Sequence, residues 1–221
     1  PLPSPTRTPT PQPTRTPTVK PTRPPEDVLD VAERIRRKRE EEERNQLVKN
    51  GFLGFLDKDS KAGDDFAQDM DIYATGDKFY AQKFTVPVAF NLKSVELALC
   101  KFGGDEGSIW AEVREDRNGR PGSGAQDVVS SRALDISGLK WDPTYPWTRF
   151  AGFAKRETIP LKAGSYWIVL RYSGDAIFNW RCQMGNYYGD NEDSRASGAV
   201  AGPWNEVVNV DLNFKVVGSP Q

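Results

Sequence analysis

The chain has 221 residues, of which 30 are basic and 31 acidic, so its formal net charge is −1 and its charge balance favours neither nucleic acid nor a membrane surface as a partner. Histidine is absent, which excludes Ser–His and Cys–His nucleophile pairs and every zinc site that requires a histidine ligand. There is no run of roughly 18 apolar residues, so no membrane-spanning helix is predicted.

Residues 1–25 are a Pro/Thr-rich tract built on an eight-residue repeat, in which Pro5-Thr-Arg-Thr-Pro-Thr-Pro-Gln12 is followed by Pro13-Thr-Arg-Thr-Pro-Thr-Val-Lys20. Proline fixes φ and removes a hydrogen-bond donor, so the tract is predicted to be an extended polyproline II arm. The pattern leaves open a plain linker, an O-glycosylated stalk and an arm ordered by neighbouring subunits.

Residues 26–50 are predicted to form a charged helix. Two prolines precede it, and Glu26 and Asp27 suit the positive end of a helix dipole. Its first two turns carry an apolar stripe that includes Val28, Val31 and Ile35, after which basic and acidic residues alternate at i,i+4 spacing. The helix is either a solvated connector or a short docking or oligomerisation helix whose stripe needs a partner.

Residues 51–68 are predicted to be a connector with an apolar start. Phe52, Leu53 and Phe55 lie close together in it, and an exposed cluster of this kind would be adhesive. We therefore expect these side chains to pack either on the following domain or on another chain of an assembly.

From residue 69 the sequence changes to short alternating runs separated by turn residues, with no helical stretch between them. In one such run Val95, Leu97 and Leu99 share a face. The pattern predicts an all-β fold, an antiparallel jelly-roll-like β-sandwich over residues 69–218. The expected strands are Lys78–Thr85, Leu92–Lys101, Ser108–Glu115, Val128–Ile136, Trp147–Ala154, Ser165–Tyr172, Ala176–Met184 and Val207–Val217.

The two cysteines, Cys100 and Cys182, both fall in expected strands. Two thiols cannot form a four-cysteine metal site. They are therefore either one disulfide or two buried free thiols, and the sequence leaves both alternatives open.

Several phrases between Lys78 and Val217 resemble those of a β-sandwich family of bacterial surface proteins and phage structural proteins. They are Tyr80-Ala-Gln-Lys-Phe-Thr85, Leu92-Lys-Ser-Val-Glu-Leu-Ala-Leu99, Asn118-Gly-Arg-Pro-Gly122, Leu161-Lys-Ala-Gly-Ser-Tyr-Trp-Ile-Val-Leu170 and Leu212-Asn-Phe-Lys-Val216. The resemblance implies a jelly-roll-like sandwich that is appended to larger extracellular or virion proteins. It brings no catalytic motif, and the two cysteines are not part of its pattern.

Two predicted loops combine aromatic side chains with amides and acids, which is the composition that a sugar-binding platform needs. The first spans residues 140–147 and is too rich in proline to be a strand. The alternative is that these aromatic residues cap the ends of the sandwich or pack between strands. The candidate stacking residues are Trp141, Tyr145, Trp147, Tyr187, Tyr188 and Trp204.

Two further groups of carboxylates could bind a metal ion or act as an acid–base pair. Asp190, Glu192 and Asp193 could supply oxygen ligands to Ca²⁺, although a solvated acidic loop is the simpler interpretation. Glu112 and Asp116 have the spacing that places two carboxylates on one face of a strand, as in a glycosidase pair. Nothing in the sequence marks either of them as a catalytic acid, so we expect no enzymatic activity and no cofactor.

Together these features predict a non-catalytic structural or adhesive subunit of an extracellular assembly, such as a fibre, a filament or a virion decoration. The arm and the helix would engage neighbouring subunits while the sandwich is displayed. The alternative prediction is a carbohydrate-binding module on a glycosylated linker. The expected partners are copies of this chain or other subunits of the assembly, and glycans.

Overall fold

The structure is a computed structural model that describes residues 34, 38, 41, 45, 52–55, 70–184, 188–189 and 192–221. The predicted arm lies outside the described residues, as do Val28, Val31 and Ile35 of the predicted apolar stripe. The described positions of the predicted helix are helical and exposed; they are Arg34, Lys38, Glu41 and Asn45.

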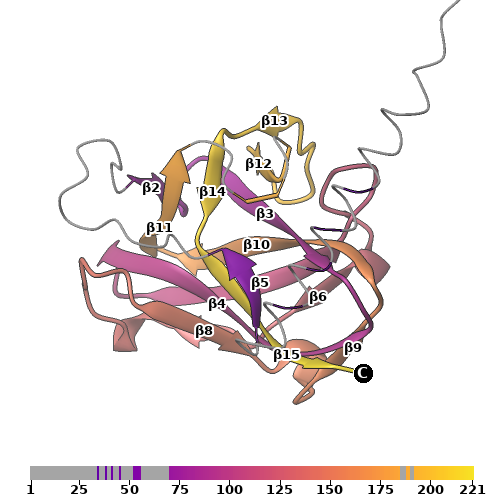
Figure 1. The fold of residues 1–221 in the computed structure, drawn as a ribbon. Coiled ribbons are helices and arrows are strands. Elements are labelled where there is room, and N and C mark those ends of the chain that lie inside the picture. Colours follow the sequence, from indigo (N-terminus) through magenta and orange to yellow (C-terminus); the bar gives the residue numbers. More distant parts are fainter. Residues whose placement is uncertain are drawn as a thin grey trace, which may run out of the picture. The chain divides into compact units, whose positions relative to one another are not determined.

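The described strands form two antiparallel sheets, as expected for a β-sandwich (Figure 1). The first sheet has the order β1-β15-β4-β11-β14, and β2 pairs with β11 while β8 and β9 pair with β4. Its strands are β1 (Phe52–Phe55), β2 (Met70–Tyr73), β4 (Phe90–Gly103), β8 (Trp147–Ala151), β9 (Ile159–Leu161), β11 (Ile177–Met184), β14 (Val210–Leu212) and β15 (Phe214–Pro220).

The second sheet has the order β13-β12-β3-β10-β5-β6, and β7 pairs with β5. Its strands are β3 (Phe79–Val86), β5 (Gly107–Glu115), β6 (Val128–Ser130), β7 (Leu134–Asp135), β10 (Gly164–Gly174), β12 (Ser194–Ser197) and β13 (Glu206–Val207). Three short 3-10 helices connect strands; they are η1 (Ala125–Asp127), η2 (Ile136–Gly138) and η3 (Phe153–Lys155).

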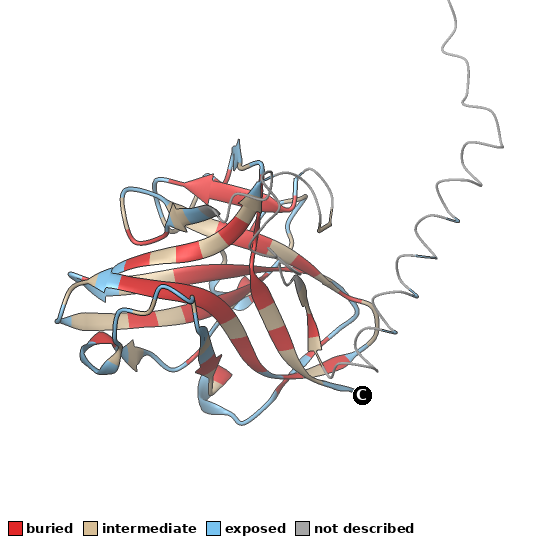
Figure 2. Ribbon diagram, turned by 60° about the vertical axis from the view of Figure 1, so that its left-hand side comes forward, coloured by how far each residue is buried: buried red, intermediate tan, exposed pale blue. Residues whose placement is uncertain are grey.

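The hydrophobic core lies between the two sheets and follows the predicted alternation. Val95, Leu97 and Leu99 of β4 are buried on one face, as are Ile168 and Leu170 of β10. Figure 2 shows this alternation as bands of buried and less buried residues along the strands. A core of this extent explains how the domain holds together with both cysteines free.

A second, smaller hydrophobic cluster covers the outer face of the second sheet. It joins Ala81 of β3, Trp167 and Val169 of β10, and Trp204 from the segment that follows β12. Strand β10 is therefore buried on both faces, which explains why its sequence is apolar almost throughout.

Several predicted strands are shorter in the structure because the backbone turns where the sequence still looks extended. The strand expected up to Ala154 ends at Ala151, because Gly152 adopts φ 69° and η3 follows it. The strand expected over Val128–Ile136 divides into β6 and β7, and the one expected over Val207–Val217 divides into β13, β14 and β15.

Strand β1 comes from the segment that was predicted to be a connector. It pairs with β15 through the register Phe52↔Val217 to Phe55↔Phe214, and Leu53 is buried in the main core. Leu53 therefore packs on the domain itself, which is one of the two alternatives that the sequence left open. Within the described ranges, no helix is long and apolar enough to cross a membrane.

Candidate functional site

The segment Lys140–Trp147, here named the aromatic loop, lies beside the second half of β4. Trp147 opens β8 and pairs with Ala98, while the N–H of Leu99 donates to the carbonyl of Pro146 at 3.4 Å. Because Leu97 and Leu99 point into the core, Ala98 and its partner Trp147 lie on the outer face of the first sheet.

A buried lysine anchors the start of the aromatic loop. Lys101 is 8% exposed, and its ammonium group donates to the carbonyls of Ile136 at 2.9 Å and Leu139 at 3.1 Å. These bonds satisfy a buried charge with backbone acceptors and fix the chain immediately before Lys140. Lys101 was not identified as an anchor from the sequence. The available signal was its position, which continues the alternation of the inward-facing Val95, Leu97 and Leu99.

Tyr145 ties the middle of the loop to two other strands. Its hydroxyl donates to a carboxylate oxygen of Asp71 in β2, and the amide of Asn179 in β11 donates to the same oxygen at 2.7 Å. Burial, with the Asp71 bond as the next cause, raises the pKa of Tyr145 well above its usual range. The phenol is therefore neutral and acts as a donor at any physiological pH.

A local turn completes the loop. The carboxylate of Asp142 accepts the N–H of Thr144 at 2.9 Å and its hydroxyl at 2.6 Å, which is an Asx turn. The bond from the Thr144 hydroxyl is the largest cause that lowers the pKa of Asp142. The aromatic loop is thus held at its start, in its middle and at its end.

Two tryptophans of this anchored loop face solvent. Trp141 is 61% exposed and Trp147 is 37% exposed. The ammonium of Lys215 lies 4.0 Å from the centroid of the Trp147 ring and 3.8 Å from a carboxylate oxygen of Glu96, so a cation–π contact orients that ring. Of the six predicted stacking residues, Trp141, Tyr145 and Trp147 are thus brought together in one fixed loop.

The outer face of the same sheet exposes further large apolar side chains. They are Tyr73 of β2, Phe102 of β4 and Ile177 of β11. Tyr73 is paired with Asn179, whose amide belongs to the group around Tyr145. The aromatic loop therefore borders an apolar sheet face rather than standing alone.

Of the described aromatic residues of the second predicted platform, Trp204 is buried and Tyr188 is half-buried. Trp204 is only 2% exposed, because it packs on Trp167 and Val169 and stacks against the guanidinium of Arg114 at 5.6 Å. Tyr188 packs edge-on against Phe214, with ring centroids 5.2 Å apart. The prediction that the Trp204 ring is available to a sugar is wrong, since the ring is buried, whereas the half-buried Tyr188 stays a prediction. Tyr187 lies outside the described residues.

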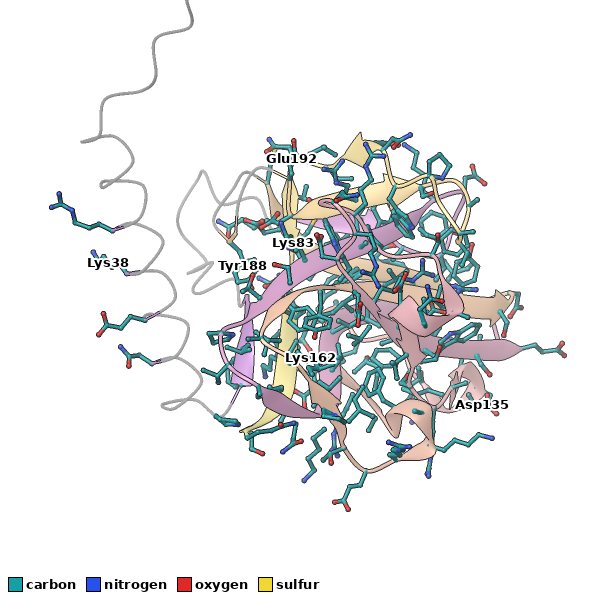
Figure 3. The ribbon with its side chains drawn as sticks, turned by 90° about the vertical axis from the view of Figure 1, so that its right-hand side faces the viewer. Lys38, Lys83, Asp135, Lys162, Tyr188 and Glu192 are labelled. Atoms are coloured by element: carbon teal, nitrogen blue, oxygen red, sulfur yellow. The ribbon has the colours of Figure 1, made fainter. Side chains whose placement is uncertain are left out.

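The acidic loop does not assemble a metal site in the described part of the chain. The carboxylate of Glu192 accepts a bond from Arg195 at 2.6 Å, and Glu192 lies at the edge of the sandwich (Figure 3). Asp193 is buried, and Asp190 lies outside the described residues. Among the residues that are described, no group of three or more cysteine, aspartate or glutamate side chains could hold a metal ion.

The disulfide that the sequence left open is not formed, and both cysteines are free and buried. Cys100 pairs with Asn179 across β4 and β11, whereas Cys182 lies three residues further along β11. An odd offset places the two thiols on opposite faces of the sheet. Burial raises the pKa of both thiols, that of Cys182 to about 12.

The carboxylates of Glu112 and Asp116 have structural partners. Glu112 is bonded to the guanidinium of Arg114 at 2.5 Å and to that of Arg171 at 2.7 Å. Asp116 accepts the indole N–H of Trp167 at 2.6 Å. Each carboxylate is committed to its own bonds on the second sheet, which is not the arrangement of an acid–base pair.

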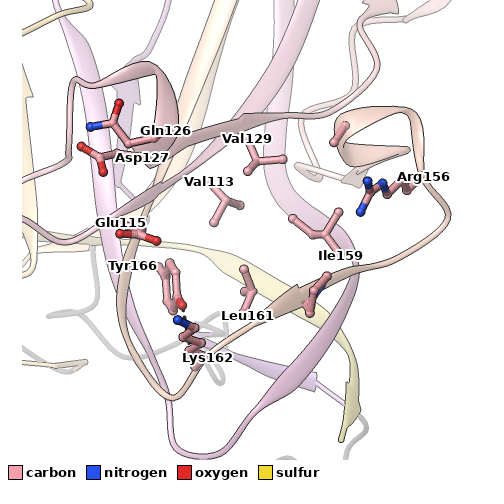
Figure 4. Close-up of a pocket in the computed structure, with 12 residues that line it drawn as sticks. Val113, Glu115, Gln126, Asp127, Val129, Arg156, Ile159, Leu161, Lys162 and Tyr166 are labelled. Atoms are coloured by element: carbon pink, nitrogen blue, oxygen red, sulfur yellow. Dashed lines mark hydrogen bonds between the residues drawn. The ribbon is translucent and has the colours of Figure 1, made fainter.

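A pocket of about 360 Å³ opens at one end of the sandwich, between β5, β9 and η3. Figure 4 shows Glu115 and Asp127 on one side of it and Arg156 on the other. The hydroxyl of Tyr166 is already bonded to the carbonyl of Lys162 at 3.0 Å, and Asp127 is paired with Arg117. The pocket is within the size range of small-ligand sites, but its polar groups are largely satisfied within the chain.

No protein-family model matches the chain, and no curated protein is significantly similar to it. The candidate site therefore stands on its geometry. Its decisive feature is the fixed aromatic loop with two exposed indole rings.

Proposed function

We propose that this chain is a non-catalytic adhesive subunit of an extracellular surface assembly, and that the aromatic loop is its ligand-contacting surface. One observation carries the proposal: Trp141 and Trp147 are exposed on a loop that Lys101, Tyr145 and the β8–β4 pairing hold in place. Exposing two large rings costs solvation free energy, and a fixed loop loses little conformational entropy when a ligand binds.

A glycan is the ligand that best fits this surface. The faces of sugar rings are apolar, so they pack on indole rings, while their hydroxyl groups need hydrogen-bonding partners at the rim. Tyr145 and Asn179 share one oxygen of the Asp71 carboxylate, and the other oxygen of Asp71 could accept from such a hydroxyl group. The exposed face with Tyr73 and Phe102 would extend the contact area.

The repeat arm, the predicted helix and the resemblance over Lys78–Val217 support the assembly part of the proposal. They favour a jelly-roll-like sandwich displayed on a cell or virion surface, with the arm and helix engaging copies of this chain or other subunits. The second candidate is a monomeric carbohydrate-binding module on a glycosylated linker. The aromatic loop favours both candidates equally, so oligomeric state separates them.

The glycan contact is tested by screening the whole chain against a panel of neutral and charged glycans, together with Trp141→Ala and Trp147→Ala. We expect each variant to weaken binding by roughly tenfold, since a stacked ring contributes about 1–1.5 kcal/mol. Val207→Ala is the matched control, because it removes an exposed apolar side chain from the second sheet. If the panel binds nothing, or if the tryptophan variants bind like the control, the aromatic loop is not the contact surface.

Assembly is tested by light-scattering mass of the whole chain and of residues 51–221. The shorter chain must keep β1, since that strand belongs to the sheet. We expect the whole chain to assemble at micromolar concentration and the shorter chain to be monomeric. Two monomers would instead favour the carbohydrate-binding module on a linker.

A further inference from the structure

Five cationic side chains surround a second depression of about 320 Å³ on the first sheet, here named the basic hollow. They come from separate parts of the chain: β4, the segment after β6, the end of β8 and the turn of η3. Among the described residues, the only carboxylate that lines it belongs to Glu157. The cations are Lys93, Arg132, Arg149, Lys155 and Arg156.

Backbone contacts fix the segments that carry Arg132, Lys155 and Arg156. The N–H of Arg132 donates to the carbonyl of Ala151 at 2.9 Å, which joins its segment to the end of β8. The Arg132 side chain lies against Gly152, where an added Cβ would come within 2.8 Å of the Arg132 Nε. Buried Phe153 anchors the following turn, in which Lys155 adopts a φ of 60°, a strained value for a residue with a side chain.

The basic hollow carries more positive than negative charge, although Glu157 lines it and Glu96 of β4 is the register partner of Arg149. None of its five cations forms an ion pair with any carboxylate of the described residues, and all five are exposed. Elsewhere on the sandwich Arg114, Arg117, Arg171 and Arg195 are all paired with carboxylates. Unpaired cations around a concave surface concentrate positive potential and attract anions.

The basic hollow continues the aromatic loop along one strand. Trp147 and Arg149 are two residues apart in β8, so both side chains point to the outer face and their Cα atoms are about 7 Å apart. Strand β8 lies at the edge of the sheet beside β4 (Figure 1), so nothing in the sheet separates the two features. A single chain-like ligand can therefore contact the indole rings and the cations together.

We propose that the basic hollow binds the sulfate or carboxylate groups of an acidic polysaccharide whose sugar rings contact the aromatic loop. The inference rests on the proposed glycan contact and names its substrate class. A single-stranded nucleic acid also combines anions with flat rings, but proteins that bind it carry basic residues along an extended groove. Here the net charge is −1 and the unpaired cations gather in one depression, which favours a ligand with spaced anionic groups.

The test measures binding of the whole chain to dextran sulfate, polygalacturonate, unmodified dextran and oligothymidylate over a range of salt concentrations. The first two polymers distinguish sulfate from carboxylate as the recognised group. We expect Arg149→Gln and Arg156→Gln each to weaken binding of at least one acidic glycan by roughly tenfold. Each should also lower the slope of log K against log salt by about one. Arg120→Gln, which removes an exposed arginine outside the hollow, should change neither quantity.

The outcomes separate this inference from the proposed function. Acidic glycans that bind no better than dextran, or hollow variants that behave like Arg120→Gln, would overturn the inference even if neutral glycans of the panel bind through Trp141. Oligothymidylate bound as tightly as the acidic glycans would overturn the choice of a polysaccharide. Acidic glycans that bind with dependence on Arg149 but not on Trp141 or Trp147 would support the hollow and contradict the aromatic contact.

Discussion

Tyr145 links the aromatic loop to two strands of the sheet through a single hydroxyl group, and buried Cys100 is the register partner of Asn179 in that group. Tyr145→Phe removes the bond to Asp71 while keeping the ring. We expect this variant to open the loop more often, so that Cys100 reacts several-fold faster with a thiol reagent. The reaction is followed by mass spectrometry of peptides, which resolves Cys100 from Cys182.

Cys182 provides the internal control for that experiment, because its thiol faces the core between the sheets. Its labelling should be slow in both proteins and should follow global unfolding. Equal acceleration at both cysteines would mean that Tyr145→Phe destabilises the whole sandwich. An unchanged rate at Cys100 would show that the hydroxyl does not hold the loop.

Glu112 lies between two guanidinium groups on the second sheet, where Glu112 and Arg114 are almost fully buried. Arg114→Ala would leave the carboxylate with Arg171 and the longer bond from the Trp110 indole, and it would also remove the ring contact to Trp204. We expect a loss of about 3–5 kcal/mol in the free energy of unfolding, the usual cost of breaking a buried pair. Urea denaturation measures it. Arg149→Ala, which removes an exposed arginine, should cost far less, and equal losses would contradict the network's role.

At the scale of elements, β1 makes residues 52–55 part of the sandwich. Leu53→Ala should lower the free energy of unfolding by about 2–4 kcal/mol, because it leaves a cavity in the main core. Deleting residues 1–50 should leave that free energy nearly unchanged, whereas deleting residues 1–69 should lower it at least as much as Leu53→Ala. Chemical denaturation of Leu53→Ala and of the two truncated chains measures these free energies. Two equally stable truncated chains would show that β1 contributes little to the stability of the sandwich.

The sequence predicted the central strands well and the irregular ones poorly. Strands β4 and β10 are long, and the apolar residues that recur at every second position in their sequences are buried. The strand expected over Val128–Ile136 is interrupted at Ser131. There the N–H of Ala111 donates to the Ser131 hydroxyl rather than to a backbone carbonyl. Strand β1 was missed because four residues carry too little periodicity to reveal a distant partner such as β15.

At the scale of the whole molecule, stability should fall in acid. Arg117 holds the pKa of Asp127 below its usual value, and hydrogen bonds from Ser137 and Thr144 do the same for Asp135 and Asp142. A lowered folded-state pKa means that each carboxylate stabilises the fold above its unfolded pKa of about 3.9. This contribution disappears as the pH falls through the folded-state pKa.

The acid dependence is checked by urea unfolding at pH values from about 7 down to 2.5. Asp127→Asn should be less stable than the unmodified chain near neutral pH and should lose less stability on acidification. Glu157→Gln, which changes an exposed carboxylate with no ion pair among the described residues, is the control. A variant that keeps the full acid dependence would show that Asp127 does not contribute to it.

The loop position of half of the candidate stacking residues could be predicted from the sequence. Trp141 and Trp147 were found because a proline-rich loop with aromatic residues has a recognisable composition. Trp204 has a similar composition around it, but the long-range packing on Trp167 decides its burial and leaves no local signal. The anchors Asp71 and Asn179 were missed for the same reason, since only the register of β2 and β11 brings them together.

The pairing of β1 with β15 also determines how the sandwich responds to a pull on the segment that precedes it. Tension applied from the N-terminal side first loads four paired residues at the edge of the sheet, whereas β10 and β5 share nine pairs in the interior of theirs. We expect β1 to detach at low force while the inner strands stay paired. Its release would lengthen the tether, and its re-pairing on relaxation would make the attachment extensible and reversible under mechanical load.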